Sequence, residues 1–171
     1  MPTEITRTHT ALDGTRSTAI YSDCEAYRYA LTRRWAEGPT LAFVMLNPST
    51  ATEAANDPTI ARCEARARMW GYGGLAIANL FAFRATDPRD LKTAAEPTGP
   101  AADRLLLETC RDAALTIAGW GVHGVHLDRA ARVRALLRDS GVGLHTLGLT
   151  KHGHPRHPLY VAYTRTPEPW P

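Results

Sequence analysis

The chain has 171 residues, of which 44% are hydrophobic and 22% charged, with a net charge of +3 at pH 7. These values predict one domain with a substantial core, which we expect to be a monomer. Since no long apolar segment indicates a membrane span or an export signal, we expect a cytoplasmic protein. Cys24, Cys63 and Cys110 are widely spaced, which argues against a disulfide framework, a zinc ribbon or an iron–sulfur cluster.

The first predicted element is an antiparallel hairpin. Residues 18–22 and 27–35 alternate partly between apolar and polar side chains around Asp23-Cys24-Glu25. We expect this pair to cap one edge of a sheet. The chain is interpreted as a single domain, 1–171, in which residues 1–15 and 165–171 are loosely ordered tails.

Four apolar runs that each end in polar or glycine-rich residues predict the centre of the sheet. They cover residues 41–46, 75–78, 114–118 and 144–149, with helix-like segments between them. That alternation is typical of an α/β protein with a central, mostly parallel sheet flanked by helices. Because the carboxyl ends of parallel strands meet at one edge, where open α/β sheets place their ligands, the residues after these runs should converge.

Three helices are predicted between the strands. The first begins with Asp57 as its N-cap and Pro58 in its first turn, and ends at Gly71. Arg62 and Arg66 lie four residues apart on its non-apolar face, which we interpret as solvated. The other helices cover about residues 101–112 and 126–139.

Two segments outside the predicted helices and central strands also carry a prediction. The long connection from residue 80 to Pro100 lacks a strong period and is predicted to be a substrate-side loop. Residues 161–163 are expected to form a short final strand. Histidines 152, 154 and 157 cluster in the loop before it, but their alternate spacing among Gly and Pro, with no evident carboxylate partner, does not predict a metal site.

Motifs at the strand exits resemble a known set. They are Met45-Leu46-Asn47-Pro48-Ser49-Thr50-Ala51, Asn56-Asp57-Pro58-Thr59, Asn79-Leu80-Phe81-Ala82, Ala118-Gly119-Trp120-Gly121 and Pro155-Arg156-His157-Pro158-Leu159-Tyr160. Over nearly the whole chain, this set resembles an uncharacterised bacterial family known only as a domain of unknown function. The resemblance identifies a family without an activity.

A more distant resemblance is to the uracil-DNA glycosylase superfamily. Its members carry a strand followed by an Asp-Pro or Asn-Pro turn, a later strand ending in Asn, a strand leading into Trp-Gly, and a loop with His-Pro. In this chain Leu46-Asn47-Pro48, Asn79, Trp120-Gly121 and His157-Pro158 match these motifs in the same order. The likeness implies a three-layer fold of the uracil-DNA glycosylase type.

The same likeness implies a DNA base N-glycosylase, a DNA-repair hydrolase without cofactor or metal that acts on a damaged, deaminated or modified base flipped into a pocket. In the catalytic group, Asn47 would orient water, His157 would donate to the departing base and Asp57 could supply basicity. In the substrate-binding group, Asn79 would pair with the base edge and Phe81 would form an aromatic wall. The remaining substrate-binding candidates are Pro48, Ser49, Trp120 and the phosphate-binding Lys151 and Arg156.

Each candidate also has a structural interpretation. Asn47 can be a turn former, Asn79 can bond to backbone at a strand end, and His157 can be a hydrogen-bonded structural residue. The aromatic candidates can be packing residues, and Asp57 is expected to be mainly an N-cap. For the whole chain, the alternatives are a non-catalytic domain that binds DNA or a nucleotide, and an enzyme of free nucleotide or modified-base metabolism.

Overall fold

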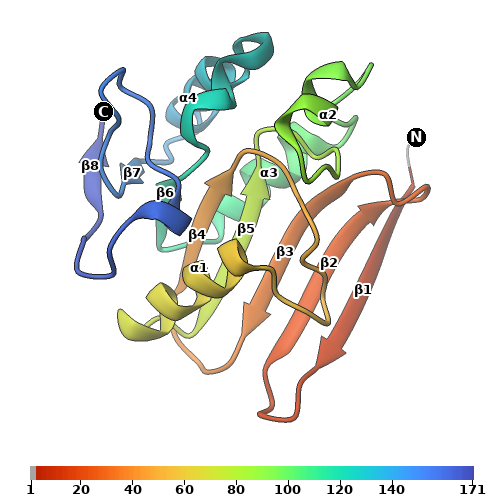
Figure 1. The fold of residues 1–171 in the computed structure, drawn as a ribbon. Helices are drawn as coiled ribbons and strands as arrows, with labels where there is room; N and C mark the ends of the chain where they lie inside the picture. The colour runs from red at the N-terminus through yellow and green to blue at the C-terminus, as the bar shows by residue number, and fades with distance from the viewer. Residues whose placement is uncertain (1–2) are drawn as a thin grey trace.

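The computed structural model describes residues 3–171, which fold around a mixed sheet of eight strands (Figure 1). In chain order the strands are β1 (Glu4–Thr10), β2 (Arg16–Ser22), β3 (Arg28–Arg34), β4 (Thr40–Met45), β5 (Gly74–Asn79), β6 (Leu115–Ala118), β7 (Leu144–Thr146) and β8 (Glu168–Trp170). Across the sheet their order is β1-β2-β3-β5-β4-β6-β7-β8.

Only the centre of the sheet is parallel. Strands β5, β4, β6 and β7 run parallel to one another, whereas β1, β2 and β3 on one side and β8 on the other pair antiparallel. The predicted α/β class and the hairpin of β2 and β3 are confirmed, but the hairpin does not cap the sheet, because β1 pairs with β2 and occupies the edge. The prediction of a mostly parallel sheet is wrong, because both ends of the chain add antiparallel strands.

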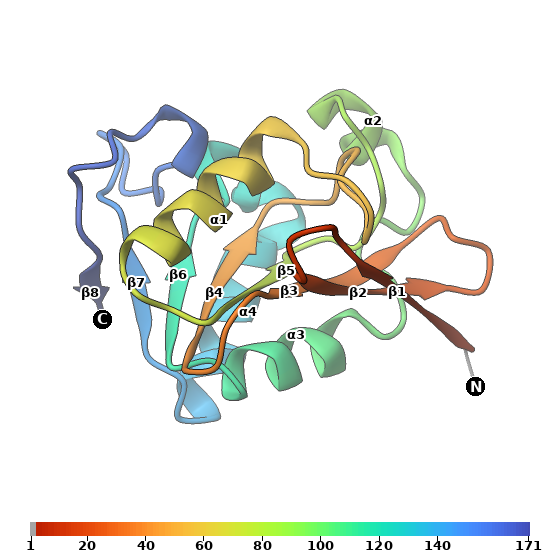
Figure 2. The same ribbon diagram turned by 90° about the horizontal axis from the view of Figure 1, so that it is seen from below.

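Helices cover both faces of the sheet (Figure 2). They are α1 (Pro58–Met69), α2 (Pro88–Thr93), α3 (Ala102–Arg111) and α4 (Arg129–Asp139), with short 3-10 helices η1 (Gly121–Asp128) and η2 (Pro158–Tyr160). Phe43 packs in the cluster on the α1 face, while the next residue, Val44, packs with α3 and α4. Burial on both faces explains why the central strands read as unbroken apolar runs.

The N-terminal segment is an edge strand and not a loose tail. Strand β1 pairs with β2 from Glu4 opposite Ser22 to Thr10 opposite Arg16. Most β1 side chains are exposed, so backbone hydrogen bonds hold the strand in place and no apolar period marks it in the sequence. Residues 1–2 of the predicted tail lie outside the described residues.

The predicted C-terminal tail, residues 165–171, also contains a strand. Strand β8 pairs with β7, and the Trp170 ring packs 5.7 Å from the Trp120 ring, measured between centroids. The Arg134 guanidinium lies 3.8 Å from the centroid of Trp170. Pro169 is tolerated because β8 lies at the sheet edge. Within residues 3–171, no helix has the length and apolar character that crossing a membrane requires.

Candidate functional site

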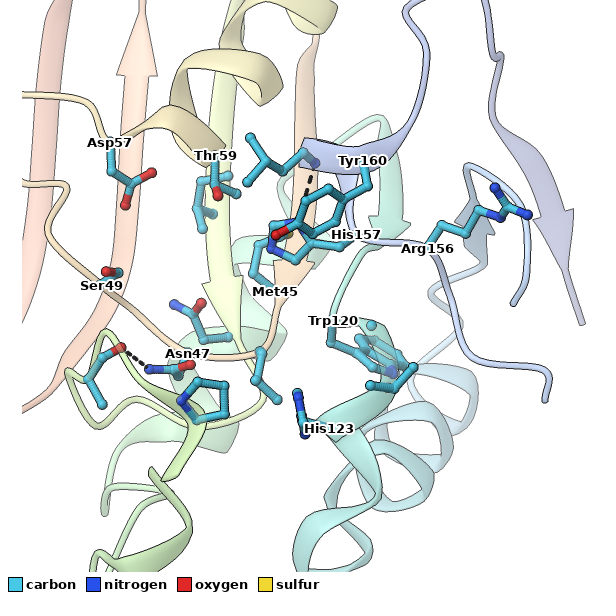
Figure 3. A pocket seen from close by; sticks show the side chains of 18 of the residues that line it. Met45, Asn47, Ser49, Asp57, Thr59, Trp120, His123, Arg156, His157 and Tyr160 are labelled. Atoms are coloured by element: carbon cyan, nitrogen blue, oxygen red, sulfur yellow. Dashed lines mark hydrogen bonds between the residues drawn. The ribbon is translucent and has the colours of Figure 1, made fainter. Parts of the chain in front are cut away.

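A pocket of about 750 Å³ opens at the carboxyl ends of the parallel strands, on the face that α1 covers (Figure 3). Its apolar walls come from Met45 of β4, Ile77 of β5 and Ile60 of α1. Polar groups converge on it from the segments that follow β4, β5, β6 and β7. Its volume lies within the range of small-molecule and cofactor sites.

The structure brings most of the predicted site residues to this pocket. The predicted residues that line it are Asn47, Ser49, Asp57, Asn79, Trp120, Lys151, Arg156 and His157. Pro48 and Phe81 do not line it. The eight lining residues meet because parallel strands present their carboxyl ends at one edge, which brings segments more than a hundred residues apart in sequence to one place.

Asn79 is the least satisfied polar side chain of the pocket. It ends β5, and its side chain is only 4% exposed. Neither Oδ1 nor Nδ2 has a hydrogen-bond partner among residues 3–171. The structural interpretation, that Asn79 bonds to backbone at the strand end, is therefore wrong. A buried polar group without a partner costs about 1–3 kcal/mol, so this amide is suited to a ligand that offers it a donor and an acceptor.

His157 is held in one tautomer. Its Nδ1 accepts a hydrogen bond from the backbone N–H of Leu159 at 3.2 Å, which makes His157 the N-cap of η2. In the neutral ring the proton therefore resides on Nε2. Burial lowers the pKa of His157 below its usual value of 6.5, and the nearby Asp57 carboxylate only partly offsets this. At neutral pH the ring is an uncharged hydrogen-bond donor.

Two arginines of α1 hold the loop that carries His157. Arg66 is fully buried, and its guanidinium donates to the backbone oxygens of Pro158 at 3.1 Å and Val161 at 2.5 Å. Arg62 donates to the same two oxygens at 3.2 and 2.6 Å, and the Tyr163 ring lies against both guanidinium groups. The interpretation of this helix face as solvated is wrong.

These contacts also explain the conformation after η2. The predicted strand over residues 161–163 does not form, because the Val161 oxygen is bound by arginine side chains and not by a neighbouring strand. Gly119, which has no side chain, lets Pro158 in the loop that carries His157 pack close to Met45 of β4. A Cβ atom there would lie 3.0 Å from Met45 Sδ and 3.0 Å from Pro158 Cδ, so a larger residue would push the His157 loop away from β4.

The Asn47 amide is anchored through its nitrogen. Nδ2 donates to the backbone oxygens of Ala85 at 2.7 Å and Pro48 at 2.9 Å, which ties the β4 exit to the segment before α2. This supports the structural interpretation, and it also determines the side-chain orientation. Oδ1 is left as the atom that can accept a hydrogen bond from a ligand or water.

Asp57 is the N-cap of α1, as expected. Its Oδ1 accepts from the backbone N–H of Ile60 at 2.9 Å, and its Oδ2 accepts from that of Ala51 at 3.3 Å. Both carboxylate oxygens are thus engaged with backbone, although the residue lines the pocket. Ala85, Thr86 and Pro88 also line it, so part of the connection predicted as a substrate-side loop reaches the pocket, while α2 within that connection was not predicted.

The aromatic candidates differ from their expected roles. Phe81 is fully buried in the cluster that faces α3 and α4, with its ring centroid 5.5 Å from that of His126, because the chain leaves the strand after Asn79. Trp120 is 2% exposed and packs against Trp170, so it supports the pocket wall from behind. An aromatic ring beside the site comes instead from Tyr160, 81% exposed and 5.6 Å from His157 between ring centroids (Figure 3).

Both exposed and buried basic residues line the pocket. Lys151 and Arg156 are exposed at the rim, and in Figure 3 the Arg156 side chain extends away from His157. Arg28 also lines the pocket and is buried, and no sequence pattern singled it out because its position is an ordinary strand residue. Within residues 3–171, no group of three His, Cys, Asp or Glu side chains is arranged to hold a metal ion.

Comparisons with known proteins identify a family and no activity. No curated protein and no solved structure matches the chain, so the likeness to uracil-DNA glycosylases stays a prediction. A family model described as "Protein of unknown function (DUF1643)" matches residues 28–159. The matched segment runs from Arg28 to Leu159 and includes the pocket-lining residues named here other than Tyr160. This chain therefore belongs to the DUF1643 family.

Proposed function

We propose that this protein is an N-glycosylase-type hydrolase that removes a damaged, deaminated or modified base from DNA. The observation that carries the proposal is the buried Asn79 amide, whose oxygen and nitrogen are both unpaired within the described residues and which lines a pocket large enough for a base. An amide presents an acceptor and a donor side by side, which complements the hydrogen-bonding edge of a nucleobase.

Base selection follows from the burial of Asn79. A base whose edge matches the amide satisfies both atoms, whereas a base with the opposite pattern leaves two buried groups unpaired. Sites built to hydrogen-bond a substrate reject analogues that lack the matching groups much more strongly than apolar pockets do. The apolar walls formed by Met45, Ile77 and Ile60 suit the faces of a planar ring.

Bond cleavage would use His157 and Asn47. The bond between the base nitrogen and the sugar carbon breaks, and its electron pair leaves with the base. The uncharged His157 ring donates from Nε2 to the base oxygen on which negative charge develops. Asn47 Oδ1 accepts a hydrogen bond from the water that adds to the sugar carbon. A proton from that water reaches solvent, and the base is reprotonated.

A second candidate is an enzyme that acts on a free nucleotide. It is favoured by Arg28, a buried residue that lines the pocket and that an enclosed anionic ligand could meet. The two candidates differ in salt dependence. Binding to DNA through several phosphates weakens steeply as salt rises, whereas binding of one nucleotide has a shallow dependence.

The test is incubation with a panel of single- and double-stranded oligonucleotides that contain deaminated, mismatched or alkylated bases, followed by detection of abasic sites. Release of one base type, lost in Asn79→Ala and retained in Arg138→Ala, supports the proposal. Arg138 is an exposed residue of α4 and does not line the pocket, which makes it a suitable control. If no member of the panel yields an abasic site, the proposal fails.

A further inference from the structure

Arg28 is a charged residue buried in the pocket with little to neutralise it. The residue lines the pocket and is only 1% exposed. Nη1 donates to the backbone oxygen of Ala51 at 2.5 Å, while Nε is buried without a partner among residues 3–171. Within the same residues, no carboxylate lies within ion-pair distance of the guanidinium. Burial lowers the pKa of Arg28 to about 10, so the group remains charged at neutral pH.

Two other buried arginines, Arg33 and Arg129, are paired more completely, and Arg66, whose Nε is also unpaired among residues 3–171, donates to three backbone oxygens. Arg33 donates to Asn56 Oδ1 and to the backbone oxygen of Thr52, each at 2.8 Å, and lies 3.6 Å from a Glu64 oxygen. Arg129 donates to the Leu80 oxygen at 2.6 Å and forms an ion pair with Asp103 at 2.5 Å. Neither lines the pocket.

The groups around Arg28 do not complete its shell. Asp57 is the carboxylate whose charge favours protonated Arg28, but both of its oxygens accept from backbone N–H groups at the start of α1 and in the preceding loop. Tyr21 offers no negative charge at neutral pH, because burial raises its pKa, and its hydroxyl donates to Glu53 at 3.0 Å. A buried cation that lacks an anionic partner is strongly disfavoured, so the free energy of the pocket falls when an anion enters.

We propose that the pocket binds a ligand with an anionic oxygen group, a carboxylate or a phosphate, which Arg28 holds while the ring of the ligand meets Asn79. Both side chains line the same pocket, from the adjacent strands β3 and β5. The inference rests on the base-binding role proposed for Asn79, and it narrows the substrate class to acidic bases or nucleotides. Arginine is the residue best suited to this role because its planar fork matches both oxyanions.

The closing experiment measures binding of matched ligand pairs by titration calorimetry at one salt concentration. The pairs are uracil against its 6-carboxylate, and each common nucleoside against its 5′-monophosphate. We expect at least one anionic member to bind roughly tenfold or more tightly than its neutral counterpart. The carboxylate and phosphate arms identify which oxyanion the site accepts. Equal affinity within every pair overturns the inference.

Arg28→Met tests whether Arg28 causes the preference for the anionic member of each ligand pair. This substitution should abolish the preference, whereas Arg129→Met, which removes a buried guanidinium away from the pocket, should preserve the preference despite a loss of stability. If Arg28→Met does not fold, Arg28→Lys decides, because lysine keeps the charge and loses the fork, so the preference should fall. An unchanged preference in the folded variant overturns the inference.

The outcomes separate this inference from the proposed function. Anion preference without base release from any oligonucleotide supports the anion site and removes the DNA glycosylase. Base release without anion preference supports the DNA glycosylase and overturns the anion site, since the Asn79 pocket then takes neutral bases. Failure of every ligand to bind, together with the absence of base release, removes both.

Discussion

At the scale of single residues, Asn79 and Asn47 show how the same side chain can serve opposite purposes. Both follow or end apolar strands, and the sequence offers a structural interpretation for each, a turn former for Asn47 and a bond to backbone at the strand end for Asn79. In the structure, the Asn47 nitrogen binds backbone oxygens, whereas both polar atoms of Asn79 are buried without a partner. Asn47 therefore contributes to stability and Asn79 reduces it.

This contrast leads to a first prediction. Asn79→Leu replaces an unpaired buried amide by an apolar side chain of similar size, so the free energy of unfolding should rise by about 1 kcal/mol while base binding is lost. Asn47→Leu is the matched variant and should instead destabilise by about 1–2 kcal/mol, because it removes donors to two backbone oxygens. Urea unfolding and ligand titration measure both effects. A less stable Asn79→Leu variant would contradict the assignment of Asn79 to a ligand.

His157 gives a second prediction, on pH. Its pKa in the fold lies below 6.5, so base release should be constant from neutral pH to about 6.5 and fall only at lower pH, where protonation of Nδ1 breaks the bond from Leu159. Stability should follow the same sign. The unfolded chain binds the proton more readily, so stability falls as pH drops from 6.5 through the lower pKa of the fold.

The pH–rate profile of base release measures this, with His157→Gln as the comparison. Glutamine keeps a donor but does not titrate, so its variant should be slower and lack the acidic decline. An acidic decline that persists unchanged in His157→Gln would show that His157 is not the group responsible for it.

At the scale of elements, the contact between α1 and η2 builds one side of the site. Helix α1 supplies the buried Arg66 and the neighbouring Arg62, and the η2 segment offers backbone oxygens to both. The helix therefore determines where His157 lies through the backbone of the segment that carries it. Arginine is required because its several donors can bind two carbonyl groups of one loop at once.

The third prediction tests this contact. Arg66→Met should destabilise the protein by about 2–3 kcal/mol and reduce base release, because the η2 oxygens lose a buried donor and the His157 loop becomes mobile. Arg68→Met is the control on the same helix. Its partly exposed side chain pairs with Glu64 at 3.2 Å and lies over Trp35, so its loss should cost less than about 1 kcal/mol and leave base release unchanged. Equal costs for the two variants would contradict a positioning role for Arg66.

At the scale of the whole molecule, the two ends of the chain complete opposite edges of the sheet. In Figure 1 the N-terminal strand β1 and the C-terminal strand β8 lie outermost on the two sides. Trp170 of β8 also covers Trp120, which stands directly before the pocket residues Gly121 and Val122. The C-terminus therefore supports the site from outside the family segment.

A fourth prediction follows for this edge. Trp170→Ala should lower the free energy of unfolding by about 2–3 kcal/mol, since it removes a half-buried indole that packs on Trp120 and under Arg134. Thermal melting measures the effect, and Glu168→Ala, at an exposed position of the same strand, should leave the melting temperature nearly unchanged. A Trp170→Ala protein that melts at the parental temperature would restore the interpretation of this segment as a loose tail.

The sequence by itself determined the elements and positions that depend on local patterns. Unbroken apolar runs indicated the central parallel strands, Asp57-Pro58 indicated the start of α1, and the exits of those strands indicated where polar side chains meet. These features were predictable because hydrophobic periodicity, helix capping and the shared edge of parallel strands each act over short distances or follow from strand direction alone.

Only the tertiary structure decided which of those side chains face the pocket and which partners they have. Edge strands β1 and β8 are held by backbone pairing with distant segments, so their sequences carry no apolar period. Arg28 and Arg66 look like ordinary surface arginines in the sequence, yet each is buried by residues far along the chain. Burial and hydrogen bonding of this kind depend on contacts between distant segments, which no local pattern encodes.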